Sequence, residues 1–232
     1  MKIKHSIIIA EKQCKDMLKN KTVLIQFLLF PLINIIMEHS ITFDELPEHF
    51  FTKLFAVMYL GMAPLTSMAA ILSEEKEKNT LRALLLSDIT SIEYLIGVGG
   101  YVWFVCMLGG SIFLITGNYK GYEGIVFLGS MAVGILISLL IGAVIGTWSK
   151  NQMSATSFTV PIMMVFSFLP MLSMFNETIR KVAKITYTQQ ISLFLNQTES
   201  IKITIENIIV ILFNILITSI LFRYAYKKHG FT

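Results

Sequence analysis

Residues 73–94, SEEKEKNTLRALLLSDITSIEY, form a charged segment between two long apolar segments. A segment with this many charges cannot lie in the hydrocarbon core of a bilayer, so we expect it in water. Leu81, Leu84 and Leu85 recur at helical spacing, and Glu74 lies one turn before Lys78. This spacing predicts an amphipathic helix over residues 74–86, placed between two membrane-crossing segments.

The second half of the same segment predicts another helix. Ser87 and Asp88 interrupt the apolar periodicity, and both residue types favour turns. Thr90 is followed three residues later by Glu93, which is the pattern of a capping box at a helix start. The segment therefore predicts a helix, a break, and a helix that runs into the next apolar segment.

The composition indicates an integral membrane protein. Of the 232 residues, 54% are hydrophobic and only 15% are charged, against about 25% charged in an average soluble domain. The mean hydropathy is +0.68. Cys14 and Cys106 lie in unrelated contexts, so no disulfide framework is expected. The lysines cluster at segment ends rather than among stacking aromatic residues, so we expect no nucleic-acid partner.

The predicted fold class is an all-α integral membrane protein with six transmembrane helices. The predicted spans are residues 22–37, 52–72, 95–116, 125–147, 155–175 and 207–222. The first span is short for a bilayer, which needs about 20 apolar residues. Residues 176–206 are too polar to cross and contain two short apolar pieces, which we expect to form short external helices.

Residues 1–21 are predicted to form an interfacial helix outside the six-helix transmembrane domain of residues 22–232. Such a helix has one apolar face and one basic face, and it lies in the plane of the membrane surface. A plain basic tail is the alternative. The apolar face comprises Ile3, Ile7, Ala10, Cys14, Met17 and Leu18, and the basic face comprises Lys4, Lys12, Lys15 and Lys19.

The fourth predicted span carries a small residue at every fourth position. These residues are Ser130, Gly134, Ser138, Gly142 and Gly146. A ridge of small side chains lets the backbone of another helix approach closely. We therefore expect a helix-packing contact along this ridge, with a partner helix in the same chain.

The basic residues predict the orientation in the membrane. Of the 19 lysine and arginine residues, all but six fall on the side of the six spans that holds both termini. By the positive-inside rule, the termini and residues 73–94 are cytoplasmic and the protein lies in the cell membrane. The six exceptions are Lys53, Lys120, Arg180, Lys181, Lys184 and Lys202.

Several kinds of chemistry have no matching residues. No predicted span holds Asp, Glu, Lys, Arg or His in its interior, which disfavours a secondary transporter. The chain has no Gly-x-x-x-x-Gly-Lys-Ser/Thr phosphate loop, so we expect neither ATP binding of that kind nor enzymatic activity. His39 and His49 lie beside glutamates, but their spacing matches no metal-site template, so no metal is expected.

Residues 73–88 resemble the first cytoplasmic loop of the membrane subunits of ABC-2 type transporters. That loop carries an acidic run, Gly-Thr-Leu, a short leucine-rich helix and Ser-Pro, and it docks on the ATPase. Here Asn79 stands where the family usually has Gly, and Asp88 stands where it usually has Pro. The sequence FLPML at residues 168–172, followed by Asn176, resembles the family's exit from the fifth span. The residues that match the ATPase-coupling loop are Glu74, Glu75, Glu77, Thr80, Leu81, Leu84, Leu85 and Ser87.

The resemblance implies two membrane subunits, identical or related, above two ABC ATPase subunits that bind Mg-ATP. This chain itself would bind no cofactor. Residues 73–94 would form a coupling loop with a cytoplasmic coupling helix, and residues 176–206 an external re-entrant region. We expect an exporter of a hydrophobic or amphipathic substrate, either a drug-like molecule or a peptide, with antimicrobial or cytolytic peptides as first candidates.

Two alternatives stay open at this point. A non-transporting membrane immunity or scaffold protein would share the six spans, but it has no reason to keep a charged and capped loop of this form. An intramembrane CAAX-type protease would use paired glutamates such as Glu74 and Glu75. Those proteases place an Arg where this chain has Asn79, and the only later histidine is His229, near the end of the chain.

Overall fold

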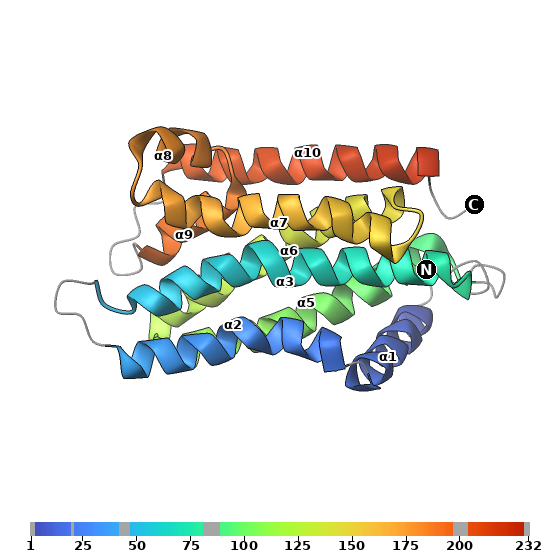
Figure 1. Cartoon of the computed structure of the whole chain (residues 1–232), viewed down its shortest axis with the longest axis horizontal. Coiled ribbons are helices and arrows are strands. Elements are labelled where there is room, and N and C mark those ends of the chain that lie inside the picture. Colours follow the sequence, from blue (N-terminus) through green and yellow to red (C-terminus); the bar gives the residue numbers. More distant parts are fainter. Residues whose placement is uncertain (1–2, 20, 42–46, 81–88, 197–203, 230–232) are drawn as a thin grey trace.

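The computed structural model describes residues 3–19, 21–41, 47–80, 89–196 and 204–229, and the regular structure in these ranges is helical. Figure 1 shows the helices, the longer ones side by side along the long axis of the molecule. They are α1 (Ile3–Lys19), α2 (Lys21–Ser40), α3 (Phe50–Glu77), α5 (Ser91–Thr116), α6 (Gly121–Trp148), α7 (Gln152–Ser173), α8 (Glu177–Ala183), α9 (Tyr187–Asn196) and α10 (Ile205–His229).

Within the described ranges, five helices, α3, α5, α6, α7 and α10, are long and apolar enough to cross a membrane. The apolar part of α2, Leu24–Ser40, is shorter, but α2 packs against α3 and α5 and runs beside α3 (Figure 1). The expectation of a helical membrane protein is therefore confirmed. That α2 completes a set of six spans remains a prediction.

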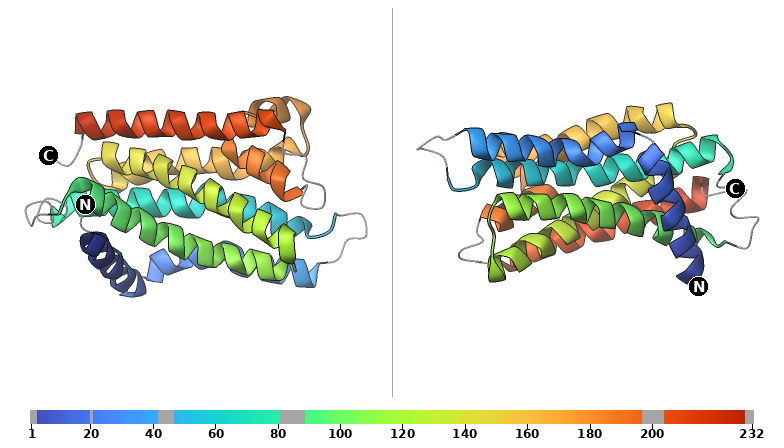
Figure 2. Two further views of the ribbon diagram at one scale, coloured as in Figure 1. Left: turned by 180° about the vertical axis from the view of Figure 1, so that it is seen from behind. Right: turned by 90° about the horizontal axis from the view of Figure 1, so that it is seen from below.

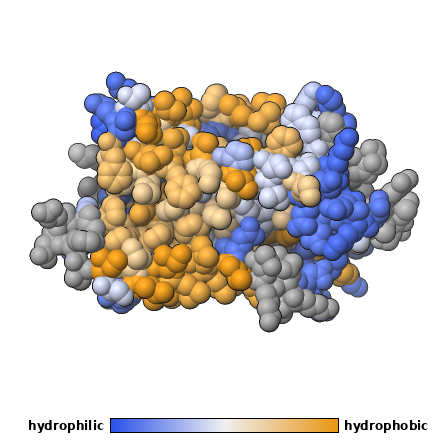
Figure 3. All heavy atoms as spheres, in the orientation of Figure 1, coloured by the Kyte–Doolittle hydropathy of each residue, from blue (hydrophilic) through white to orange (hydrophobic). Residues whose placement is uncertain are grey.

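The central helix of the bundle is α3. Helices α2, α5, α6, α7 and α9 pack against it, and most of its side chains are buried. In contrast, α10 packs on α6 and α9 and exposes most of its apolar side chains, including Leu212 and Leu216. Figure 3 shows an apolar surface over the middle of one face, with hydrophilic residues towards the ends. Such a band is the surface that a bilayer would cover.

The two ends of the bundle carry different elements. One end holds α1, the end of α3, the start of α5, the turn from α6 to α7 and the end of α10 (Figures 1 and 2). The other end holds the end of α2, the start of α3, the turn from α5 to α6, and α8 with α9. Figure 2 shows that α1 lies across its end of the bundle at a steep angle to the long helices.

The small residues of α6 face α3. A Cβ atom added at Gly142 would collide with the backbone oxygen of Leu65, and one added at Gly146 would lie 2.7 Å from Leu72 Cβ. A Cβ atom added at Gly134 would lie 3.0 Å from the Leu60 side chain. Because glycine has no side chain, the backbones of α6 and α3 can approach closely at these positions.

Ser138 adds hydrogen bonds to this contact. Its Oγ donates to the backbone oxygen of Leu60 at 2.6 Å and lies 2.7 Å from the hydroxyl of Tyr187. Tyr187 begins α9, so the same serine also ties α9 into the bundle. Ser130, the first residue of the predicted ridge, is half-buried in the N-terminal half of α6.

Helices α8 and α9 occupy the region in which two short helices were expected. Most of α9 is buried, and its polar residues bond to the bundle: Ser173 Oγ on α7 donates to Gln189 Oε1 at 2.9 Å. Asn176 caps α8, since its Oδ1 accepts the amides of Thr178 and Ile179. These contacts hold the connection between α7 and α10 against the end of the bundle that lies away from α1.

Candidate functional site

The charged run of the sequence begins as the last turns of α3. The helix continues through Glu77, and the amide of Lys78 still donates to Glu74 O at 2.9 Å. Asn79 then has a φ of 56°, in the left-handed region that Gly and Asn tolerate best. The helix therefore breaks at Lys78 and Asn79. The prediction of one helix over residues 74–86 is wrong, because its acidic half belongs to α3.

Thr80 follows this break, and its Oγ1 donates to Glu75 O at 3.2 Å, which closes the turn. Four of the predicted ATPase-coupling residues, Leu81, Leu84, Leu85 and Ser87, lie outside the described residues. The predicted leucine-rich coupling helix falls in the same range, residues 81–88.

Glu75 points into the protein. It is only 6% exposed, and its Oε1 accepts from Lys12 Nζ at 2.7 Å and from Gln13 Nε2 at 2.5 Å, both on α1. Tyr94 on α5 lies close to the same carboxylate. Glu75, one of the predicted ATPase-coupling residues, therefore points towards α1 rather than into solvent, and its part in coupling stays a prediction.

Lys76 and Glu77 also contact neighbouring helices. Lys76 Nζ donates to Thr147 O at 2.6 Å, at the C-terminal end of α6. Glu77 Oε2 accepts the amide of Gln152 at 2.8 Å, at the N-terminal end of α7. A cation at a helix C-terminus and an anion at an N-terminus both complement the helix dipole. The charged end of α3 thus joins α6 and α7.

Like Glu77, which is exposed, Glu74 is not buried: its side chain is 34% accessible to solvent. It forms an ion pair with Lys78, and this hydrogen bond raises the pKa of the lysine above its usual value. Exposed pairs of this kind add little to stability because water and salt screen the charges. Glu74 and Lys78 are therefore free to meet a partner protein.

The first turn of α5 is held by its own capping box and by α1, the helix that also contacts Glu75. Thr90 and Glu93 form the predicted capping box, which is confirmed: Thr90 Oγ1 accepts the Glu93 amide, and Glu93 Oε2 accepts the Thr90 amide. Glu93 is 3% exposed and also contacts α1. Its Oε2 lies 3.1 Å from His5 Nδ1, and its backbone oxygen accepts from Ser6 Oγ at 2.9 Å.

A cavity of about 160 Å³ lies between α2, α3 and α7. Gln26 Nε2 donates to Thr66 Oγ1 across it at 2.6 Å. The hydroxyl of Thr159 is buried and has no hydrogen-bond partner among the described residues. The lining is uncharged and is formed by Gln26, Met62, Thr66, Ala70, Ala155, Thr156, Thr159, Val160 and Met163. Such a site suits apolar groups with a few hydrogen-bonding atoms.

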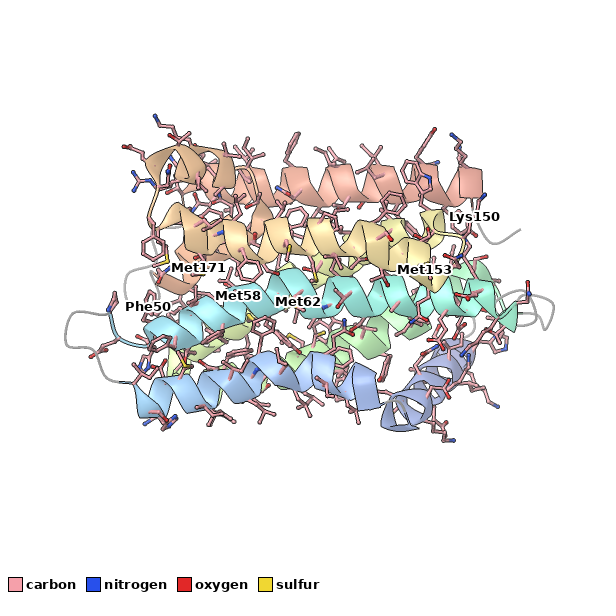
Figure 4. The ribbon with its side chains drawn as sticks, in the orientation of Figure 1. Phe50, Met58, Met62, Lys150, Met153 and Met171 are labelled. Atoms are coloured by element: carbon pink, nitrogen blue, oxygen red, sulfur yellow. The ribbon has the colours of Figure 1, made fainter. Side chains whose placement is uncertain are left out.

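The cavity belongs to a seam between α3 and α7. Figure 4 shows Met58 and Met62 on α3 beside α7, with Met153 and Met171 near the two ends of α7. A smaller hollow at the end away from α1 is lined by residues that include Phe50, Lys53 and Met171. Methionine side chains are flexible and adapt to ligands of varied shape.

The residues that line the cavity were not predicted as site residues. A usable signal was present, because a polar side chain in an apolar span, such as Gln26, often marks a buried contact or a ligand path. Which of the polar residues face one cavity depends on how α2, α3 and α7 pack. That arrangement follows from the fold and not from spacing within any one span.

The comparisons with known proteins agree with this architecture. The family model described as ABC-2 family transporter protein matches residues 3–224, from the start of α1 nearly to the end of α10. No curated protein matches the chain significantly. Because the match spans almost all of the multi-helix membrane domain, the chain belongs to the ABC-2 transporter family, as a permease subunit of the kind that works with an ABC ATPase.

Proposed function

We propose that this permease is the membrane subunit of an ATP-driven exporter that moves a hydrophobic or amphipathic substrate out of the cell. The observation that carries the proposal is the uncharged cavity between α2, α3 and α7. Its thioether, methyl, hydroxyl and amide groups offer apolar contact with a few hydrogen bonds and leave no charge to attract an ion. Antimicrobial or cytolytic peptides are the first candidates, with drug-like molecules second.

The energy comes from Mg-ATP bound to separate ABC ATPase subunits, and the chain itself is not an enzyme. The ATPase docks on the segment between α3 and α5, on the cytoplasmic side with both termini. Ala70 lines the cavity and Glu77 ends the same helix seven residues later, so about 10 Å of α3 separates the two. A displacement of the segment therefore reaches the cavity through one continuous helix.

A second membrane subunit, identical or related, covers the face of α7. This helix leaves Phe158 57% exposed and Met164 53% exposed, beside the cavity. Exposed apolar side chains around a cavity are typical of a surface that another protein or lipid covers. The substrate path then lies between the two membrane subunits.

The test is reconstitution in lipid vesicles with the ABC ATPase encoded nearest to this chain. We expect export of an amphipathic peptide probe to require ATP and to be indifferent to imposed proton and sodium gradients. Export that follows those gradients, and continues with a hydrolysis-deficient ATPase, would overturn the proposal.

A variant pair tests the docking segment in the same preparation. Replacing Leu84 and Leu85 with Ala should weaken assembly with the ATPase by about 1–3 kcal/mol for each leucine that is central to the contact. The thermal stability of the membrane domain should not change. The same change at Leu212 and Leu216, on the exposed face of α10, is the matched control and should leave assembly intact.

A further inference from the structure

Helix α1 holds both helices that flank residues 78–90. It reaches the last turn of α3 through Glu75 and the first turn of α5 through Glu93. The donors on α1 form two pairs, His5 with Ser6 and Lys12 with Gln13, which are seven residues apart. Seven residues are about two helical turns, so both pairs lie on the same side of α1, about 10 Å apart along its axis.

The contact with α3 is an ion pair between a buried carboxylate and a half-exposed lysine. Glu75 is nearly inaccessible to solvent, and Lys12 Nζ is the cation that contacts it. Gln13 donates to the same carboxylate oxygen. A buried carboxylate that loses its cation is strongly unfavourable, so this contact resists opening.

The contact with α5 depends on a close approach of the two backbones. A Cβ atom added at Gly97 would lie 2.8 Å from both the backbone oxygen of Ser6 and Ile9 Cβ. Ile9 itself is fully buried in this contact. Gly99, two residues further along α5, has no atom within 4 Å of an added Cβ.

We propose that α1 is a latch that fixes the separation between the end of α3 and the start of α5. Glu75 and Glu93 are its positioning residues, and the latch stays closed when the ATPase moves the segment between them. The inference rests on the proposed docking of an ATPase there. The latch makes α1, the end of α3 and the start of α5 move as one body. A displacement of the segment between α3 and α5 then moves both helices and does not merely separate them from α1.

The latch can be tested first without an ATPase. Cys14 on α1 is exposed and Cys106 is buried, so a nitroxide label reacts with α1 in the unmodified chain. In lipid, Lys12→Met and Gly97→Ala should each increase the mobility of this label. Their matched controls, Lys15→Met in the exposed Glu11–Lys15 pair and Gly99→Ala, should not. If Lys12→Met does not fold, the double variant Lys12→Glu with Glu75→Lys swaps the two charges. This variant should restore both the fold and the low mobility of the label on Cys14.

The second measurement follows the latch through the ATPase cycle. With labels on Cys14 and on Lys78→Cys, we expect the same interspin distance in the nucleotide-free complex and in the complex trapped with ADP and orthovanadate. In the Gly97→Ala background the distance distribution should broaden on trapping.

The outcomes separate the two proposals. A distance that changes on trapping in the otherwise unmodified chain would show that α1 moves apart from α3 and would overturn the latch. Equal label mobility in Lys12→Met and Lys15→Met would overturn it as well. A chain that binds no ATPase would instead overturn the proposed function, and the mobility comparison would still decide whether the latch exists.

Discussion

At Gly142 the backbone of α6 comes close to that of α3. An added Cβ would collide with Leu65 O and lie 2.9 Å from Met68 Cβ, and backbone atoms cannot move aside easily. We predict that Gly142→Ala lowers the free energy of unfolding by about 1–3 kcal/mol, as overpacking does, and that Gly142→Leu also lowers the yield of folded protein. Thermal unfolding in detergent measures this. Gly129→Ala, on the same helix with open space around it, is the control, and equal losses for the two alanine variants would contradict the close contact.

Thr159 and Thr66 line the same cavity but differ in their hydrogen bonds. The Thr159 hydroxyl has no partner among the described residues, whereas the Thr66 hydroxyl accepts from Gln26. We predict that Thr159→Val leaves the free energy of unfolding unchanged or raises it, while Thr66→Val lowers it by about 1 kcal/mol. If the cavity binds substrate, Thr159→Val should still change the apparent affinity for a transported peptide. Two variants with equal stability would show that the Gln26 bond has no net effect.

Residue-scale features could be predicted when their partners are local. The capping box needs only Thr90 and Glu93, three positions apart, and the left-handed turn at Asn79 falls on a residue type that tolerates this conformation. The inward direction of Glu75 could not be predicted, because its partners Lys12 and Gln13 lie more than 60 positions away. A carboxylate in a charged run gives no local sign of whether it meets water or another helix.

At the scale of elements, Asn79 decides where α3 ends. Its φ of 56° costs a residue with a Cβ about 1–2 kcal/mol, and β-branched side chains tolerate it least. We predict that Asn79→Gly preserves assembly with the ATPase, and that Asn79→Val weakens it by redirecting the segment that follows. Pull-down of the ATPase at several concentrations measures the difference. Asn118→Val, which places the same kind of strain in the turn from α5 to α6 at the other end of the bundle, is the control. Normal assembly with Asn79→Val would show that binding of the ATPase does not depend on the direction of this turn.

The elements themselves were largely predictable, because long apolar runs can satisfy their backbone in lipid only as helices. The second span is predicted to end at residue 72, and α3, the helix that contains it, continues to Glu77. The extra turns persist because Lys76 and Glu77 cap α6 and α7, and these partners come from tertiary packing. In the same way, the ridge on α6 indicated a close contact, but nothing in its sequence identified α3 as the helix that fills it.

At the scale of the whole molecule, the arrangement of the ends decides which loops can meet an ATPase. Helix α1, the end of α3 and the end of α10 lie together, away from α8 and α9 (Figure 1). Most of the basic residues belong to the first group, so the positive-inside rule predicts that this end lies in the cytoplasm. The lateral order of the helices could not be predicted, because lipid-facing and protein-facing apolar residues look alike in the sequence.

This orientation gives a prediction that native Cys14 can test. Because Cys14 is exposed on α1 and Cys106 is buried, a membrane-impermeant maleimide should label the chain only after the cells are permeabilised. Lys120 is exposed in the turn at the other end, so Lys120→Cys in a Cys14→Ser background should react in intact cells. Mass spectrometry of the chain shows which of the two cysteines carries the maleimide. Labelling of Cys14 from outside, with Lys120→Cys protected, would place α1 outside the cell. The segment between α3 and α5 would then lie beyond the reach of a cytoplasmic ATPase.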